Sequence, residues 1–257
     1  MIPARLSSPL RFTFAFVVAA ALALAAGRAH AQTWGGGQAI TGSGVVKTEA
    51  RPATAFHAIA LDVHARLELR QGDGESLSIT GDDNIVPLIE TVVESGTLKI
   101  RWAGNANYST NYKALDIVVS ARNIDSLTVG GSGQIHAAQL KTDKLHATVG
   151  GSGKIVLDTL DAASVSGTIG GSGDIIAAGR TKALDVTVAG SGKLSAGKLE
   201  CREARITMQG SGQAIVWATE SLNATVAGSG TVRYYGKPQL RQTIAGSGSV
   251  RSAGDAS

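Results

Sequence analysis

Hydrophobic residues occupy every second position in many short segments of the chain. One segment places Leu184, Val186 and Val188 in this alternation, and a later one repeats it with Ala204 and Ile206. Because side chains of a strand point alternately to opposite faces, this period of two predicts strands with one buried face. A second alternating segment usually follows a few residues later, so we expect at least two short strands in each unit.

The alternating segments belong to a repeat of 18 to 20 residues, marked by the tripeptide Gly-Ser-Gly. A unit of this length cannot bury its apolar face alone, but stacked units bury a continuous column. The repeat therefore predicts a right-handed parallel β-solenoid, with glycine at each corner because the chain must turn or pack closely there. The expected corner glycines are Gly131, Gly151, Gly171, Gly190, Gly210, Gly228 and Gly246.

The chain before the repeat is also rich in alternating segments but lacks the strict period. Residues 51–122 are therefore expected to form less regular coils or a cap, and residues 123–250 the repeat coils. Together they give a single domain over 51–254. We expect a flexible, glycine-rich lead-in at 32–50 and a polar tail at 251–257.

The first 31 residues have the features of a bacterial signal peptide. Arg5 and Arg11 precede the apolar run 12–26, and small residues at Ala29 and Ala31 suit cleavage after Ala31. The apolar run is shorter than the roughly 20 residues that span a bilayer, so no transmembrane anchor is expected after cleavage. The mature protein is expected in the periplasm, or secreted to the cell surface, of a Gram-negative-like bacterium.

Charge and composition exclude several classes of function. Three of the 24 basic residues lie in the leader, which leaves 21 against 20 acidic residues, so the mature chain gives no electrostatic case for binding nucleic acid. The single cysteine, Cys201, excludes internal disulfides and thiolate zinc clusters. It lies in an apolar stretch, where a buried and unreactive thiol is expected.

Candidate catalytic residues are few. Long β-helices occur among polysaccharide lyases and hydrolases, and hydrolysis requires two carboxylates across a cleft. The acids considered are Asp158 and Asp161, which are close in sequence, and Asp174 and Asp185, which are assigned to successive corners. We interpret them as solvated turn acids and expect that carboxylates do not converge in a concave surface. No catalytic residue, cofactor or metal is assigned, although a carbohydrate-active enzyme remains the alternative.

Charges at equivalent positions of neighbouring repeats are interpreted as surface pairs. Asp174 resembles a calcium-binding corner, but Lys154 and Lys193 occupy the same position in the adjacent repeats. A calcium ladder needs stacked carboxylates, so pairing between opposite charges on adjacent coils is the preferred interpretation.

A threonine stands three residues before each Gly-Ser-Gly. Since the next residue is apolar and buried, each threonine is expected to face outward and to stack on its neighbours. An ice-binding surface would need a second threonine row, whereas the row two positions earlier is charged and mixed, so strand propensity explains the column better. The column is nevertheless a candidate binding face: Thr128, Thr148, Thr168, Thr187, Thr207, Thr225 and Thr243.

The mature sequence resembles the bacterial family of "putative auto-transporter adhesin, head GIN domain" proteins. The resemblance rests on Gly42-Ser43-Gly44-Val45-Val46, Phe56-His57-Ala58-Ile59, Leu67-Glu68-Leu69-Arg70-Gln71-Gly72 and Gly81-Asp82-Asp83-Asn84-Ile85, followed by the Gly-Ser-Gly copies. It implies an exported β-helical protein with an adhesive or surface role and no established enzyme activity. It assigns no functional residues.

These observations together predict an exported, non-enzymatic, adhesin-like or structural solenoid that interacts at the cell envelope. Its partner is expected to be an envelope polysaccharide or a surface protein, which a long flat face could bind through many weak contacts. Edge-to-edge self-association is a further expectation, because the last coil near Ser247 has unpaired backbone groups and only a short polar segment after it.

Overall fold

The computed structural model describes residues 39–104 and 109–255. The predicted signal peptide and the first part of the predicted lead-in lie outside these residues. Among the described residues, no helix has the length and hydropathy needed to cross a membrane. Within 39–104 and 109–255, all regular structure is β apart from one 3-10 turn, η1, at Val86–Leu88.

The strands form one large sheet that winds around the core, plus a separate two-stranded sheet made by β1 and β8. The strands before the repeat are β1 (Ala39–Thr41), β2 (Val46–Arg51), β3 (Ala58–Leu61), β4 (Ala65–Gln71), β5 (Ser76–Asp82), β6 (Ile89–Glu94), β7 (Thr97–Trp102), β8 (Ser109–Asn111) and β9 (Leu115–Ala121). The strands of the repeat are β10 (Ser126–Val129), β11 (Gln134–Ala137), β12 (Leu140–Val149), β13 (Lys154–Ile169), β14 (Asp174–Gly190), β15 (Lys193–Gly210), β16 (Gln213–Gly228), β17 (Thr231–Tyr235), β18 (Gln239–Ala245) and β19 (Ser249–Ser252).

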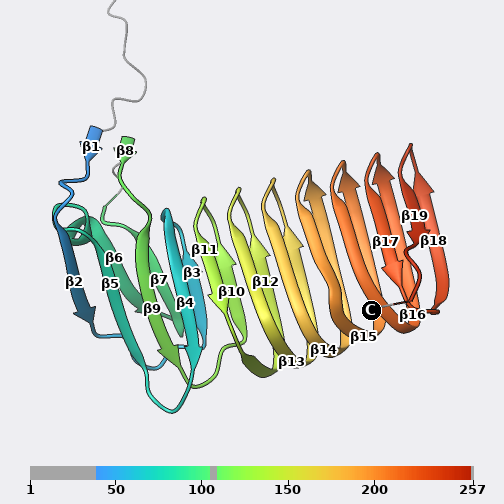
Figure 1. The fold of residues 1–257 in the computed structure, drawn as a ribbon, viewed down its shortest axis with the longest axis horizontal. Coiled ribbons are helices and arrows are strands. Elements are labelled where there is room, and N and C mark those ends of the chain that lie inside the picture. The colour runs from blue at the N-terminus through green and yellow to red at the C-terminus, as the bar shows by residue number, and fades with distance from the viewer. Residues whose placement is uncertain (1–38, 105–108, 256–257) are drawn as a thin grey trace, which may run out of the picture. The chain divides into compact units, whose positions relative to one another are not determined.

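The repeat forms the predicted parallel β-solenoid (Figure 1). Each coil lies beside the next in parallel register, and the partners are the residues that the sequence repeat makes equivalent. Thr128 pairs with Thr148, for example, and Lys154 with Asp174. Each coil has two longer sides that meet at the Gly-Ser-Gly corner and a short third side, where Leu140 pairs with Leu160. The predicted coil length and stacking are therefore confirmed.

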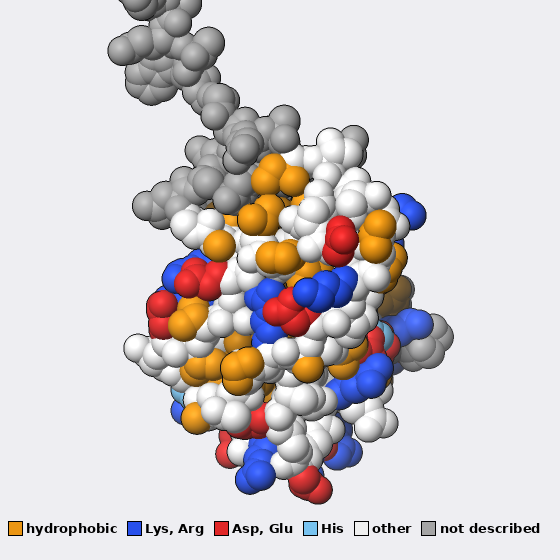
Figure 2. Space-filling view, turned by 90° about the vertical axis from the view of Figure 1, so that its left-hand side faces the viewer, with side chains coloured by type: hydrophobic (Ala, Val, Ile, Leu, Met, Phe, Trp, Pro, Cys, Tyr) orange, Lys and Arg blue, Asp and Glu red, His pale blue; other side chains and the backbone are white. Residues whose placement is uncertain are grey.

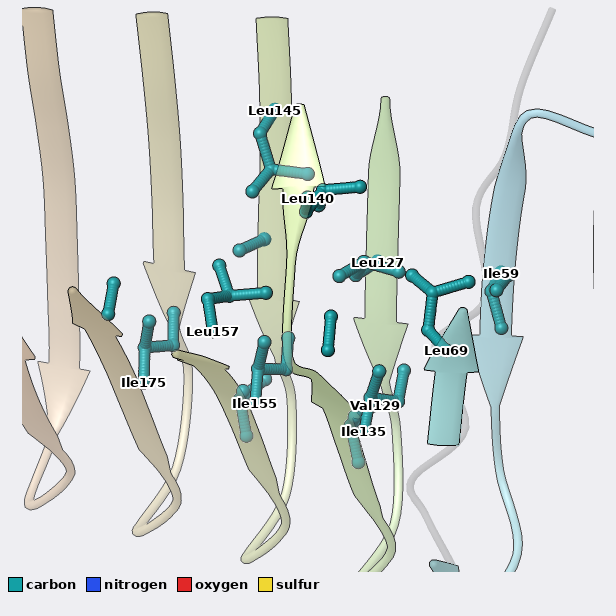
Figure 3. Packing of buried hydrophobic residues seen from close by; sticks show 14 of the residues in the cluster. Ile59, Leu69, Leu127, Val129, Ile135, Leu140, Leu145, Ile155, Leu157 and Ile175 are labelled. Atoms are coloured by element: carbon teal, nitrogen blue, oxygen red, sulfur yellow. The ribbon is translucent and has the colours of Figure 1, made fainter. Parts of the chain in front are cut away.

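The core is a column of apolar side chains that the coils supply in rows. Ile135, Ile155 and Ile175 occupy equivalent positions in three successive coils and lie one beside the other (Figure 3). They are at most 4% exposed, as is the facing residue Leu127. Because side chains at alternate positions point inward, every strand adds apolar area to the same column, and this burial is the main stabilising term.

The corner glycines are required by the close approach of successive coils. The amide of Ser211 donates to the carbonyl oxygen of Gly190, 3.0 Å away, and this bond draws the two corners together. A Cβ atom on Gly210 would lie 2.5 Å from that same oxygen. Gly210 also has φ +130°, a conformation that side chains strongly disfavour.

The seven corners do not share one conformation. Positive φ values occur at Gly190, Gly210, Gly228 and Gly246, whereas the first three corner glycines lie outside that region. Each of those three is preceded by another glycine, at Gly130, Gly150 and Gly170. Gly131 is the exception to close packing, because a Cβ there would be no nearer than 3.6 Å to any neighbouring atom.

The region before the repeat forms coils whose spatial order differs from their order in the chain. The coil of β3 and β4 lies between the strands β7 and β9, which follow it in sequence, and β10 and β11, which follow later still. After β2, the chain therefore forms the coil of β3 and β4, and then places β7 and β9 on one side of that coil. It then returns to the other side, where β10 and β11 begin the repeat (Figure 1).

Antiparallel strands close this end of the stack. Strand β5 pairs antiparallel with both β2 and β9, and β6 pairs antiparallel with β7. Ile85 and Val86, which lie between β5 and β6, are fully buried and help to cover the core. The strands β1 and β2 lie where the sequence predicted a flexible lead-in, because β2 hydrogen-bonds along β5 and Arg51 donates to the carbonyl oxygens of Val86 and Ile89.

Candidate functional site

A groove of about 1200 Å³ runs across four successive coils on their short third side. Two rows of outward side chains line it, and each row receives one residue from each coil. The first row contains Lys141, Asp161, Arg180 and Glu200, and the second contains Asp143, Ala163, Lys182 and Arg202. Both rows lie on β12 to β15, whose register aligns them along the stack.

Charges alternate in sign along the first row. Lys141 pairs in register with Asp161, Asp161 with Arg180, and Arg180 with Glu200. The Arg180 guanidinium donates to the Asp161 carboxylate over 2.7 Å. This hydrogen bond lowers the pKa of Asp161 and raises the pKa of Arg180, so both groups stay charged over the whole physiological pH range.

The second row carries basic side chains that are less well paired. Arg202 lies 3.9 Å from Glu220, an ion pair at the edge of the distance range. Lys182 and the neighbouring groove residue Lys144 are exposed, and within the described residues neither has a carboxylate at ion-pair distance. Ala163 interrupts the row with a small side chain. The groove therefore offers ammonium groups that can bind an anionic ligand.

The end of the groove nearest the cap is held in place by Gln71 of β4. Its side-chain amide donates to the carbonyl oxygen of Lys141 over 2.8 Å and accepts from the amide of Lys141 over 2.7 Å. His57 and Asp125 also line this end, 3.0 Å apart. The first coil of the repeat is thus fixed to the inserted coil of β4, which sets the position of the groove's first cation.

One expectation about carboxylates is wrong. Asp125, Asp143, Asp161 and Glu200 all line the groove, so acidic side chains do meet in a concave surface. The basic residues that alternate with them make this a mixed-charge surface.

The four acids considered as catalytic candidates are all paired with basic side chains. Asp158 accepts from His136 over 2.7 Å and Asp161 from Arg180. Asp174 lies 3.5 Å from Lys154, and Asp185 lies 3.7 Å from Arg205. General acid catalysis of glycoside hydrolysis needs a carboxyl whose pKa is raised, whereas the pKa of Asp161 is lowered. The pair of Lys154 and Asp174 is also the predicted contact between adjacent coils.

The aromatic residues near the C-terminal coils lie outside the groove. Tyr235 contributes to a smaller hollow of about 370 Å³, together with Ile176 and Ile215. None of the described residues that line the groove is a tryptophan or tyrosine. The described lining therefore offers no indole or phenol ring on which a sugar could stack, and its contacts to a ligand are mainly ionic and polar.

His136 forms an ion-pair cluster of its own on β11. Its ring lies between Glu68 of β4, at 3.2 Å, and Asp158 of β13, at 2.7 Å. Hydrogen bonding to Asp158, and then to Glu68, raises the pKa of His136. Because the two acids come from the coils on either side, this cluster ties three coils together. His146, the other histidine of the repeat, lies in a different row beside Ser126 and Ser166.

The threonine column has the geometry that the sequence predicted. All seven threonines, from Thr128 to Thr243, pair in register from one coil to the next. Their side chains are half-buried or exposed, and the apolar residue that follows each of the first six is buried. Binding by this column stays a prediction.

Cys201 is buried, as expected. The side chain is fully inaccessible, and its thiol donates to the carbonyl oxygen of Trp217 over 3.0 Å. Burial is the main cause that raises the pKa of the thiol to about 12. The thiolate that reacts as a nucleophile is therefore scarce at neutral pH.

Sequence reasoning considered only Asp161 among the residues of the two groove rows. A usable signal was present, because Lys141, Asp161, Arg180 and Glu200 follow one another at intervals of 20, 19 and 20 residues. These are the intervals between the corresponding Gly-Ser-Gly triplets. The interval places the four charges in one row, but it does not indicate that the row borders a hollow.

Comparison with known proteins gives both a family and a fold. The model of the family described as "Putative auto-transporter adhesin, head GIN domain" matches residues 55–238. No curated protein sequence matches the chain.

Three solved structures show the similarity in three dimensions. A putative adhesin from Bacteroides fragilis is 26% identical with a TM-score of 0.78, over 83% of this chain and 99% of that one. A putative lipid binding protein from Parabacteroides distasonis is 26% identical with a TM-score of 0.72, over 84% of this chain and 100% of that one. A putative adhesin from Parabacteroides merdae shares the fold at 22% identity and a TM-score of 0.67, over 84% and 99%.

Proposed function

Because the chain belongs to the "Putative auto-transporter adhesin, head GIN domain" family, we propose that it is an exported, non-enzymatic adhesin that binds a polymer at the bacterial cell envelope. The Bacteroides fragilis relative carries an adhesin name as well. The pairing of the candidate acids with basic side chains supports a binding role over the alternative of a carbohydrate-active enzyme.

The observation that carries this proposal is the groove across β12 to β15. A continuous hollow along several coils suits an extended ligand better than a compact one. Its exposed ammonium groups at Lys144 and Lys182, with the alternating charges beside them, favour a polymer that bears both anionic groups and hydroxyls. We infer that the ligand is an acidic polysaccharide of the envelope.

Charge reversal in the groove is expected to abolish this binding. In the double variant Lys144→Glu/Lys182→Glu, two attractive contacts become repulsive, so affinity for a carboxylated polysaccharide such as alginate should fall by about tenfold or more. Isothermal titration calorimetry measures the change. Lys198→Glu is the matched control, because Lys198 is exposed and lies outside the groove.

Two results would contradict the groove as the binding site. One is equal binding of alginate and neutral dextran by the wild type, since the ammonium groups should distinguish the two polymers. The other is loss of binding only when Thr187, Thr207 and Thr225 are replaced together by glutamate, which would assign the site to the threonine column.

Export is expected to remove the leader. Mass spectrometry of the protein from its host should find a chain that begins at Gln32, in the periplasm or outside the cell, because Ala29 and Ala31 form a signal-peptidase site. A chain that still carries Met1 and remains in the cytoplasm would contradict the proposed location.

A further inference from the structure

The core of the solenoid is covered by capping strands at one end but not at the other, as far as the described residues extend. At the first end, antiparallel strands and η1 cover the core, and both β2 and β6 are edge strands, since β2 pairs only with β5 and β6 only with β7. Lys47, Glu49 and Arg51 of β2 form ion pairs, with Glu49 lying 3.1 Å from Arg51 and 3.6 Å from Lys47. Figure 2 looks at this end, where basic and acidic side chains lie side by side near the middle of the face. Charged side chains on an edge strand discourage pairing with another chain.

At the other end, the last core layer is open among the described residues. Strand β18 pairs only with β16, and β19 only with β17, so both are edge strands. Leu240 pairs in register with Leu222, and Ile244 with Val226, so both continue core rows. The side chains of Leu222 and Val226 are fully buried, whereas Leu240 is 37% and Ile244 41% exposed.

The order of side chains along β18 is compatible with antiparallel pairing to β18 of a second copy. In an antiparallel pair centred on Gln242, Leu240 lies opposite Ile244 of the second copy. Arg241 then lies opposite Thr243, so no two arginines face one another. Two apolar pairs form across the junction, and the free backbone groups of both edges find partners. A two-fold pair of this kind uses the same surface twice and is closed.

We propose that the protein forms a closed dimer in which the β18 edges of two copies pair antiparallel and join the two cores. The dimer goes beyond the proposed function, since the groove lies on other coils. Continuation into a filament is disfavoured because each free end of such a dimer is capped, and its edge strands β2 and β6 carry ion-paired side chains. The copy that covers β18 also covers Leu240 and Ile244, which together with Val45 and Val46 are the most exposed large apolar side chains among the described residues.

Analytical ultracentrifugation of the purified protein tests the dimer over about 1 to 500 µM. The mass should rise from monomer to dimer and no further. Ile244→Lys places a charge at the junction and should weaken the dimer by about tenfold or more. Val46→Lys makes an equivalent change on the opposite edge, where Val46 is 72% exposed, and should leave the dimer constant within about twofold.

Hydrogen exchange on the same samples locates the contact. Amides of 239–245 should become slower to exchange as the dimer forms, while those of 46–51 should not change. If Ile244→Lys does not fold, as judged by circular dichroism, Leu240→Lys takes its place. A monomer at every concentration overturns the proposal, as does a dimer that Val46→Lys disrupts or an assembly larger than a dimer.

Discussion

Replacing Gly210 with alanine is expected to lower the free energy of unfolding by about 2 to 4 kcal/mol. The new Cβ atom would lie 2.5 Å from the carbonyl oxygen of Gly190, so two coils would have to move apart at the corner. The backbone conformation adds strain, since φ is +130° there. Thermal unfolding followed by circular dichroism should show a midpoint lower by roughly 5 to 15 °C.

Gly131→Ala is the matched control for this corner. Gly131 occupies the equivalent position of the first repeat coil, but its φ lies outside the left-handed region and a Cβ atom would have ordinary contacts with Asp62. Its melting midpoint should stay within about 2 °C of the wild type. Equal losses in the two variants would show that the corners are not distinguished by close coil packing and positive φ.

Removing a buried side chain from the middle of the core column is expected to have the other large effect. Ile169 is fully buried and lies in the row that leads through Val188 and Val226 to Ile244. Coils on both sides cover it, so Ile169→Ala leaves a cavity and should cost about 2 to 5 kcal/mol. Urea denaturation measures this loss.

The same substitution at the end of the row provides a control of identical chemistry. Ile244 is 41% exposed and has a coil on one side only. Ile244→Ala, measured at a concentration where the protein is monomeric, should cost less than about 1 kcal/mol. A cost at Ile244 equal to that at Ile169 would contradict the open end of the core, since it would mean that Ile244 is covered in solution.

The sequence predicted the repeat coils well because one physical requirement recurs in every coil. A Gly-Ser-Gly corner, a strand with one apolar face and a fixed interval between them determine which residues stack. Thr128 on Thr148 and Lys154 on Asp174 follow directly from the interval of 20 residues. The alternation thus predicts which side chains of a strand are buried, and the interval predicts which residues of the next coil lie beside them.

Where the interval is missing, alternation alone cannot identify the neighbouring strand. Nothing in 51–122 indicates that β3 and β4 lie between later strands, because Ile59 would be equally buried beside either neighbour. The glycines and polar residues of 32–50 predict a flexible lead-in, and no local pattern there indicates that β2 pairs antiparallel with β5. The groove has no local sequence signal for a related reason, since its first end depends on hydrogen bonds between Gln71 and Lys141, which are 70 residues apart in the chain.

The most direct test of the proposed function is a hydrogen-exchange footprint of the wild-type protein with and without alginate. Binding in the groove predicts slower exchange in four short segments, namely 141–144, 161–163, 180–182 and 200–202, which line it on successive coils. The strands that carry Thr187, Thr207 and Thr225 should show no change beyond these segments. Protection of the threonine strands with an unchanged groove, or no protection anywhere at saturating polymer, would contradict the account.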